Sequence, residues 1–197
     1  MPSNLRIIKT AIFISGRGSN MKSLIKYSQK KNSKIKIAKV FSNNKTAKGI
    51  DIAKKLNVPE IYYYSNKFFE EKIKKNLDDI ELICLAGFMK ILSPLFVKKW
   101  KKRLINIHPS YLPHFKGLNA QRKAIEAKAS FSGCTVHYVN KKIDSGNIIK
   151  QKKIKILKKD NTESLTKKIL IEEHKLYPKA LNVVVNRLLL NEKINYK

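Results

Sequence analysis

Apolar positions along the chain fall into short runs that alternate with stretches of helical periodicity. Runs rich in Val, Ile and Phe predict strands, and stretches in which apolar residues recur every three or four positions predict helices. The strands are expected at residues 7–15, 35–41, 61–64, 82–85, 104–107, 133–140 and 148–156. The helices are expected at about residues 20–29, 47–56, 68–76, 94–100, 117–127 and 162–190.

The order of these elements predicts the fold class. Strands that alternate with helices are typical of βαβ units, which build a mostly parallel central sheet. The last two expected strands flank a short turn and alternate in polarity, so we expect antiparallel C-terminal strands before a long C-terminal helix. The sequence thus predicts an α/β, Rossmann-like fold in a single domain, residues 1–197, with no internal repeat or linker.

Two of the expected helices begin with capping signals. Ser93 followed by Pro94 predicts an N-cap and a first helical residue, because proline lacks an N–H that the first turn would leave unsatisfied. Asp160, with Glu163 three residues later, resembles a capping box at the start of the C-terminal helix.

The composition is that of an ordinary folded domain. The 197 residues are 43% hydrophobic, enough to bury a sizeable core. The N-terminus lacks the apolar segment of a secretory signal, and no apolar run reaches the roughly 18 residues that cross a bilayer. Cys84 and Cys134 have neither CxxC nor disulfide-framework spacing and are expected to be buried free thiols. We therefore expect a cytoplasmic protein without a membrane partner.

A strong positive charge is the unusual feature of the composition. The formal net charge is +29, and such charge is the electrostatic footprint of many nucleic-acid-binding proteins. Here the lysines are spread through every segment, and only 5 of the 43 basic residues are arginine, the better reader of phosphates and base edges. The matching excess of Asn and Ile indicates a genome rich in A and T. We therefore expect small-molecule substrates rather than nucleic acid, with the charge attracting anions over long range.

Asn106 and His108 are the first candidate catalytic residues. In an extended segment residues i and i+2 point to the same side, so both can face one cleft while Ile107 packs behind them. Asp144 lies in the turn 142–146, and its approach to His108 in space is a hypothesis at this point. An amide, an imidazole and a carboxylate can together stabilise an oxyanion and move a proton, which is the chemistry of acyl transfer.

A glycine turn, residues 15–20 (SGRGSN), lies between the first expected strand and the first expected helix. Backbone N–H groups and the helix dipole favour an anion at such a place. The turn is not the dinucleotide fingerprint, because Met21 holds its last glycine position, and no Gly-Lys-Ser/Thr follows to make a Walker A loop. Ligands of open α/β sheets bind beyond the carboxyl ends of the strands, so we expect this turn and His108 to line one crevice.

Residues 85–92 (LAGFMKIL) leave the fourth expected strand in a similar way. A glycine followed by an apolar segment can line a slot for a flat aromatic ligand, with backbone groups supplying polar recognition. The same segment is equally typical of a buried loop that fills a core.

Several motifs, taken in order, resemble those of the phosphoribosylglycinamide formyltransferases. They are ISGRGSN, VFSNN, LAGFMKILSP, INIHPSYLP, GCTVHYV, the Asp-Ser-Gly turn and EEHKLYP. The resemblance implies a formyltransferase enzyme of de novo purine biosynthesis with the single-domain fold of that family. It implies 5-phosphoribosylglycinamide as acceptor substrate, 10-formyltetrahydrofolate as cosubstrate, and no metal.

The resemblance also implies roles for individual residues. The positions that match the family's catalytic trio are Asn106, His108 and Asp144. Those that match contacts to phosphoribosylglycinamide are Gly18, Ser19, Asn20 and Glu173. Those that match the folate site are Met89, Lys90, Ile91, Leu92, Asn106 and the loop before Asp144. A phosphoribosyl-binding half, about 1–100, and a folate-binding and catalytic half, about 101–197, are thereby expected within the single domain.

The implied mechanism is direct attack of the glycinamide amine on the formyl carbon. The oxyanion of the tetrahedral intermediate would be held by the Asn106 amide and by His108 as an imidazolium, whose pKa Asp144 would raise. Because the amine must be neutral while His108 is charged, a bell-shaped pH profile is expected.

Three alternatives stay open beside this assignment. A methionyl-tRNA formyltransferase would suit the positive charge, but such enzymes carry a further C-terminal RNA-binding domain for which the chain, ending at Lys197, has no room. A formyltetrahydrofolate hydrolase would carry an additional N-terminal regulatory domain. A non-catalytic basic RNA-binding protein would leave the trio unexplained. The sequence predicts a monomer or homodimer without distinguishing them.

Overall fold

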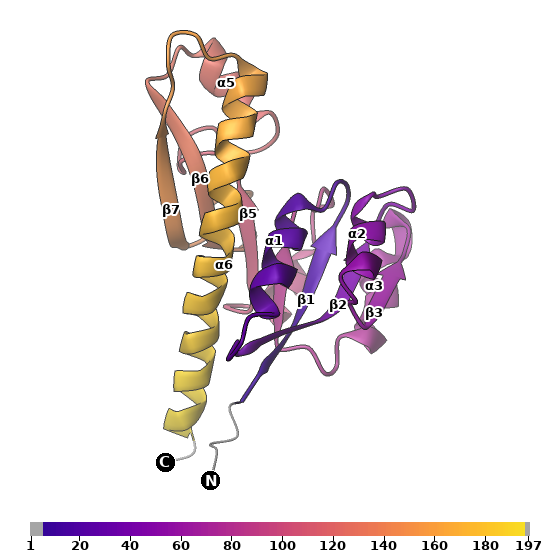
Figure 1. Cartoon of the computed structure of the whole chain (residues 1–197). Helices are drawn as coiled ribbons and strands as arrows, with labels where there is room; N and C mark the ends of the chain where they lie inside the picture. The colour runs from indigo at the N-terminus through magenta and orange to yellow at the C-terminus, as the bar shows by residue number, and fades with distance from the viewer. Residues whose placement is uncertain (1–5, 196–197) are drawn as a thin grey trace. The chain divides into compact units, whose positions relative to one another are not determined.

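The computed structural model describes residues 6–195 (Figure 1). This part of the chain contains seven strands, six α-helices and two short 3₁₀ helices. The strands are β1 (Ile8–Ile14), β2 (Ile35–Ser42), β3 (Glu60–Tyr63), β4 (Leu82–Leu85), β5 (Leu104–His108), β6 (Phe131–Tyr138) and β7 (Ile148–Lys155). The helices are α1 (Ser19–Ser28), α2 (Gly49–Lys55), η1 (Asn66–Phe68), α3 (Phe69–Ile73), η2 (Lys74–Asn76), α4 (Pro94–Lys99), α5 (Ala120–Glu126) and α6 (Thr162–Asn195).

The chain divides into two compact units, one formed by the residues up to Leu92 with those from Leu181 onward, the other by Ser93–Ala180. Strands of the first unit follow the order β3-β2-β1-β4, and all of these pairs are parallel. Strands of the second unit follow the order β5-β6-β7, and both pairs are antiparallel. The predicted fold class, a mostly parallel sheet with antiparallel C-terminal strands and a long C-terminal helix, is confirmed. The expected organisation as one domain with two functional halves stays a prediction.

The core of the first unit forms because β1 and β2 are buried along almost their whole length. Strands covered on both faces carry continuous apolar runs, as in the Ala11–Ile14 segment of β1. The Phe13 ring meets the Phe41 ring of β2 edge-on, with centroids 5.4 Å apart. From α1, Met21, Leu24 and Ile25 are buried at helical spacing. This packing fixes the end of β1, from which the glycine turn departs.

The core of the second unit lies between β6 and α6. Cys134 packs with Ala124 of α5 and with Leu165 and Ile169, which are one turn apart on α6. In Figure 1, β6 and β7 run side by side, with the N-terminal part of α6 along them. Cys84 and Cys134 are buried free thiols, as predicted. Burial raises the pKa of the Cys134 thiol to about 12, so this thiol stays protonated at neutral pH.

Helix boundaries differ from the sequence predictions in three places. The single helix expected at residues 68–76 is a one-turn α3 between two 3₁₀ helices, because only Phe69 and Ile73 of this stretch are buried to hold a helical face. Helix α5 begins at Ala120 rather than near Gly117, since Gly117 and Asn119 have positive φ angles that no right-handed helix contains. Helix α6 extends beyond the expected residue 190 to Asn195.

The predicted N-cap of α4 is confirmed, whereas the capping box predicted for α6 is formed by other residues. The Ser93 hydroxyl accepts a hydrogen bond from the Phe96 N–H, with Pro94 as the first residue of α4. At the start of α6, however, Asn161 and Ser164 form the reciprocal pair, each side-chain oxygen accepting the other's backbone N–H, at 2.8 and 3.0 Å. Asp160 instead accepts from the Leu157 N–H, from Lys168 and from the Ser164 hydroxyl.

Within residues 6–195, no helix is both long enough and apolar enough to cross a membrane. In the same range, no three His, Cys, Asp or Glu side chains are grouped in a way that could hold a metal ion.

Candidate active site

Strands β5 and β6 present the candidate catalytic side chains in register. Asn106 lies opposite His137, and His108 lies opposite Thr135 two positions further along. Residues two apart on a strand face the same side of the sheet, so Asn106 and His108 share a face, as the sequence predicted. His108 is 5% exposed and is therefore a buried polar residue.

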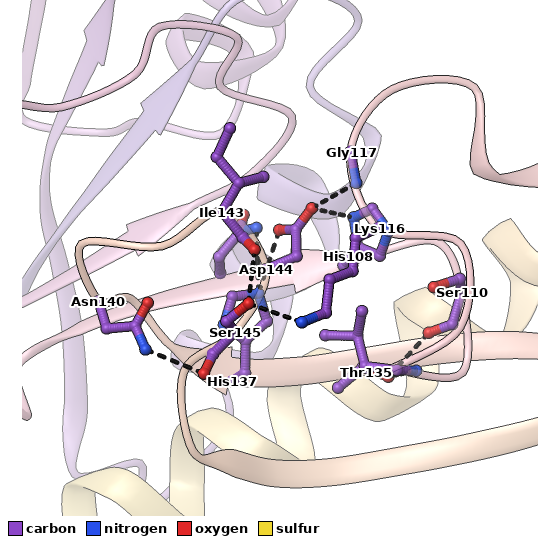
Figure 2. A network of polar contacts seen from close by, with 12 residues as sticks. His108, Ser110, Lys116, Gly117, Thr135, His137, Asn140, Ile143, Asp144 and Ser145 are labelled. Carbon is purple, nitrogen blue, oxygen red and sulfur yellow. Dashed lines mark hydrogen bonds and ion pairs between the residues drawn. The ribbon is translucent and has the colours of Figure 1, made fainter.

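Asp144 reaches this face from the turn between β6 and β7. Its Oδ2 atom lies 3.2 Å from His108 Nδ1 and accepts a hydrogen bond of 2.9 Å from the Gly117 N–H (Figure 2). The residue has a φ of 45°, in the left-handed region that Asp tolerates better than most side chains. The hypothesis that Asp144 approaches His108 is therefore confirmed in space.

Gly146 makes this turn possible, since a Cβ atom at position 146 would overlap the Tyr138 carbonyl oxygen. Only a residue without a side chain lets the chain fold back so closely on β6.

Both ring nitrogens of His108 face acceptors. Nδ1 faces the Asp144 carboxylate, and Nε2 lies 2.9 Å from the Phe115 carbonyl oxygen. A neutral imidazole carries one N–H and can donate to one of these oxygens, whereas an imidazolium can donate to both. The site is thus arranged to receive a proton on His108.

Burial nevertheless lowers the pKa of His108 below its ordinary value. The loss of hydration outweighs the carbonyl of Phe115 and the charge of Asp144, both of which raise this pKa. The expected effect of Asp144 has the right sign, and burial opposes it because the imidazole lies almost entirely out of water. The imidazolium expected during the reaction stays a prediction.

Asp144 stays ionised in the same environment. Burial raises its pKa, but the contact with His137, the charge of His108 and the Gly117 N–H together outweigh burial and lower it. The ionised carboxylate can stabilise a proton that arrives at the neighbouring ring.

His137 links the amide and the carboxylate, a connection that the sequence did not predict. Its Nδ1 donates to the Tyr138 carbonyl at 2.9 Å, while Nε2 lies 3.4 Å from Asn106 Nδ2 and 3.5 Å from Asp144 Oδ1. The available signal was its position in β6, two residues beyond Thr135, since antiparallel pairing with β5 places it opposite Asn106.

The segment after His108 is anchored by hydrogen bonds to β6 and β7. The buried Thr135 hydroxyl donates to the Ser110 carbonyl at 2.7 Å and accepts from the Leu112 N–H at 3.1 Å. Gln151 of β7 donates both to the Leu112 carbonyl and to Thr135. These bonds fix the backbone that runs from His108 towards Phe115 and Gly117 (Figure 2).

In the first unit, the glycine turn forms the N-terminus of helix α1. Gly18 caps α1 in the left-handed conformation (φ 73°), and its carbonyl accepts the first helical hydrogen bond from Lys22. A Cβ atom on Gly18 would lie 2.7 Å from Gly49 Cα, so the two backbones require glycine to approach this closely. Ser19 and Asn20 open the helix, where their N–H groups belong to the first turn.

Ser15 joins this turn to the segment after β4. Its N–H donates to the Gly87 carbonyl at 3.1 Å, and its hydroxyl accepts from the Met89 N–H at 2.8 Å. Met89 and Ile91 are 68% and 75% exposed, whereas Leu92 is buried. The segment 89–92, with Lys90 half-buried, is therefore not the core-filling loop that the sequence left open, because two of its apolar side chains face outward.

Glu173 lies on α6 in the second unit and is buried. Burial raises the pKa of Cys134 most strongly, and the charges of Glu173 and Glu172 raise it further. The trio and Glu173 thus belong to one unit, and the residues 18–20 and 89–92 belong to the other.

A comparison with protein families assigns the chain. The family described as Formyl transferase matches residues 8–181, which include every candidate site residue. The chain belongs to the formyl transferase family. This family membership agrees with a site in which an amide, an imidazole and a carboxylate are grouped for acyl-group chemistry.

Several curated relatives are larger than this formyl transferase. The trifunctional purine biosynthetic protein adenosine-3 of Homo sapiens is 39% identical over 185 residues, covering 90% of this chain but 18% of its own length. The Chironomus tentans protein of the same name is 41% identical, and the chain spans 14% of it. The phosphoribosylglycinamide formyltransferase of Haemophilus influenzae is 35% identical over 196 residues, which are 95% of this chain and 92% of that protein.

Solved structures show the same fold. The phosphoribosylglycinamide formyltransferase from Anaplasma phagocytophilum has a TM-score of 0.88 at 42% identity, covering 92% of this chain and 88% of that one. The enzyme of the same name from Brucella melitensis has a TM-score of 0.86 at 37% identity, covering 91% and 96%. The Rossmann-like formyltransferase fold predicted from sequence is thereby confirmed.

Proposed function

We propose that this chain transfers the formyl group of 10-formyltetrahydrofolate to the amine of 5-phosphoribosylglycinamide, giving 5-phosphoribosyl-N-formylglycinamide and tetrahydrofolate in purine (IMP) biosynthesis. The observation that carries the proposal is the pairing of His108 Nδ1 with Asp144 Oδ2 at 3.2 Å on the same sheet face as Asn106. Relatives that the chain covers almost completely, such as the Haemophilus influenzae protein, support formyl transfer to phosphoribosylglycinamide by their name.

The proposed reaction begins with a neutral His108. The amine nitrogen attacks the formyl carbon, and the carbonyl oxygen becomes an oxyanion that accepts a hydrogen bond from Asn106. His108 takes the proton lost by the attacking amine, and the resulting imidazolium is stabilised by the ionised Asp144 and donates to the oxyanion. When the intermediate collapses, the bond from the formyl carbon to the folate nitrogen breaks, and that nitrogen receives the proton.

In these steps the imidazolium of His108 forms during the reaction. In the mechanism expected from sequence, by contrast, His108 is already charged when the amine attacks. The lowered pKa of His108 supports a neutral base at neutral pH, and the acceptors at both ring nitrogens support the charged form that follows. For His108 to touch substrate, its Nε2 must leave the Phe115 carbonyl, so substrate binding is expected to displace that contact.

The binding roles belong to the same proposal. We assign the phosphate to the turn formed by Gly18, Ser19 and Asn20, because first-turn N–H groups of a ten-residue helix favour an anion. We assign a contact with the same substrate to Glu173 and the pterin surface of the folate to residues 89–92. The proposal further includes a cytoplasmic enzyme that needs no metal and is a monomer or a homodimer, to be tested by assay with a chelator and by light scattering.

One assay tests the proposed function. Purified protein is mixed with 10-formyltetrahydrofolate and 5-phosphoribosylglycinamide, and the release of tetrahydrofolate is followed. Release that requires the glycinamide supports the transferase, whereas release without it would indicate a hydrolase. No release under either condition would contradict the proposal.

A formyltransferase acting on methionyl-tRNA is the second candidate, and the net charge of +29 favours it. Replacing phosphoribosylglycinamide by methionyl-tRNA in the same assay distinguishes the two. Turnover with the tRNA that exceeds turnover with the glycinamide would decide for this alternative.

A further inference from the structure

Two adjacent residues of the loop after β5 contact two adjacent residues of the Asp144 turn. The Gly117 N–H donates to Asp144 Oδ2 at 2.9 Å, and Lys116 Nζ donates to Ser145 Oγ at 2.7 Å. Figure 2 shows both contacts side by side, with Lys116 and Gly117 on one loop and Asp144 and Ser145 on the other. Only the first contact is part of the catalytic group described above, and the second has no role in the proposed chemistry.

The Ser145 side chain and backbone also form hydrogen bonds within the turn itself. The hydroxyl donates to the Ile143 carbonyl at 2.8 Å, across Asp144, while the Ser145 carbonyl accepts from Asn140 Nδ2 at 2.9 Å. Asp144 therefore holds its left-handed φ of 45° inside a turn that is closed on both sides by the same serine. A non-glycine residue keeps such a conformation only when its surroundings impose it.

Lys116 is fixed at its other end. Its carbonyl accepts from Lys123 Nζ, 3.1 Å away on α5. The ammonium that reaches Ser145 thus starts from a backbone segment held to a helix, although the Lys116 side chain itself is exposed.

We propose that Lys116 and Ser145 form a latch that positions Asp144 against His108, making both of them positioning residues for the reaction. The inference rests on the proposed function for its effect on turnover, and on geometry alone for its effect on the His108–Asp144 pair. The latch matters because a carboxylate on a short turn can rotate away from the imidazole, and misplacement of a catalytic group by about 1 Å can cost about 100-fold in rate.

The titration of His108 reports the latch without any substrate. The charged and titratable groups that act on this ring are Asp144 from the turn, His137 from β6 and Lys123 from α5. Loss of the latch weakens the influence of Asp144, the group that raises the pKa of His108. If Lys116 acted through its charge alone, removing that cation would raise the pKa instead, so the sign of the change separates the two explanations.

The test compares Ser145→Ala, Lys116→Met and the double variant with wild type. Ring titration of His108 by NMR in the protein without substrate should give a lower midpoint in each variant. The kcat of formyl transfer should fall about 10- to 100-fold in each, and the double variant should fall no further than the more affected single one, because Ser145→Ala already removes the contact that Lys116→Met breaks. Ser145→Thr, which keeps the hydroxyl, should restore both readouts.

Lys158→Met is the matched control, since it removes one exposed lysine of the same unit without removing a contact in the turn. It should leave the His108 midpoint at the wild-type value. A wild-type midpoint in both Ser145→Ala and Lys116→Met would overturn the latch, and so would a raised midpoint in Lys116→Met. Failure of wild-type protein to transfer formyl groups would instead contradict the proposed function, while the titration would still decide the latch.

Discussion

His108 Nδ1 and Asp144 Oδ2 lie 3.2 Å apart, although 36 positions separate the two residues in sequence. Both side chains are almost fully covered, with 6% and 10% of their surfaces exposed. Coulombic attraction between a charged pair is much stronger when water is excluded, so Asp144 offsets part of the desolvation that disfavours a proton on His108. Each of the following predictions depends on this pair or on the segments proposed to bind the substrates.

Removing either member of the pair should abolish most of the turnover. His108→Ala deletes the proposed proton acceptor, and Asp144→Asn deletes the charge that stabilises its imidazolium. We expect each to lower kcat by roughly 100-fold or more, the scale typical of lost acid–base or oxyanion groups. Steady-state formyl transfer measures the effect. His114→Ala, which removes an exposed ring from the neighbouring loop, should retain turnover, and near wild-type kcat in either pair variant would exclude that residue from the mechanism.

The pH dependence should place His108 below its ordinary titration range. Burial lowers the pKa of His108 from 6.5, so kcat/KM should rise with pH along a limb whose midpoint lies under that value. Since Asp144 raises this pKa, Asp144→Asn should move the midpoint of His108 further down. NMR titration of the ring in the protein without substrate gives both midpoints. A wild-type midpoint above 6.5 would support instead the imidazolium in the starting state that the resemblance implied.

Asp144 should also contribute to stability in a defined pH range. Its pKa is lowered in the folded protein, so its contribution is present above the unfolded value near 3.8 and is lost as pH falls through the folded pKa. The free energy of unfolding of wild type should therefore exceed that of Asp144→Asn at pH 6, and the gap should narrow in acid. Urea unfolding at several pH values checks this, and a gap that widens as pH falls would contradict the assignment.

His137 should contribute to stability and to the pKa of Asp144 through its contacts with Asn106 and Asp144. His137→Leu leaves Asn106 Nδ2 and Asp144 Oδ1 without the ring nitrogen that lies between them. Loss of partners by buried polar groups costs about 1–3 kcal/mol, so we expect the free energy of unfolding to fall by that amount. The loss of the contact that lowers the Asp144 pKa should raise that pKa, measurable by carboxyl NMR. An unchanged Asp144 titration would show that His137 only fills space.

In the glycine turn, substitution by alanine should destabilise the protein at Gly18 but not at Gly16. Gly18→Ala forces a Cβ into a left-handed residue that touches Gly49, so it should destabilise the first unit and raise KM for phosphoribosylglycinamide more than for the folate. Gly16→Ala is the stability control, because its Cβ would meet no atom within 4 Å. Equal unfolding midpoints for the two variants would contradict the close approach.

The sequence predicted most strands and helices correctly because their signals depend on residues close together in the chain. The apolar run that became β1 is recognisable by itself, and so is the Ser93–Pro94 start of α4, because burial on both faces and a free first-turn N–H each depend on a few neighbouring residues. The helix expected at residues 68–76 was predicted less well, since whether its ends continue as α-helix depends on which side chains the rest of the unit covers.

The candidate catalytic residues were reached by two different routes. Asn106 and His108 share a strand, so their common face follows from the two-residue period of extended backbone. Asp144 was linked to them as a hypothesis from its chemistry and then by resemblance to a family. Its contact with His108 depends on a left-handed turn and on Gly146 passing close to β6, neither of which any residue pattern near position 144 specifies.

By itself, the sequence determined the order of strands and helices, the shared face of Asn106 and His108, and the glycine turn at the start of α1, because each follows from periodicity or backbone conformation within a few residues. Only the tertiary structure decided that His137 joins Asn106 to Asp144, that Lys116 reaches Ser145, and that burial outweighs Asp144 in setting the pKa of His108. The physical reason is that desolvation and hydrogen bonding depend on every group surrounding a side chain, and those groups come from separate parts of the chain.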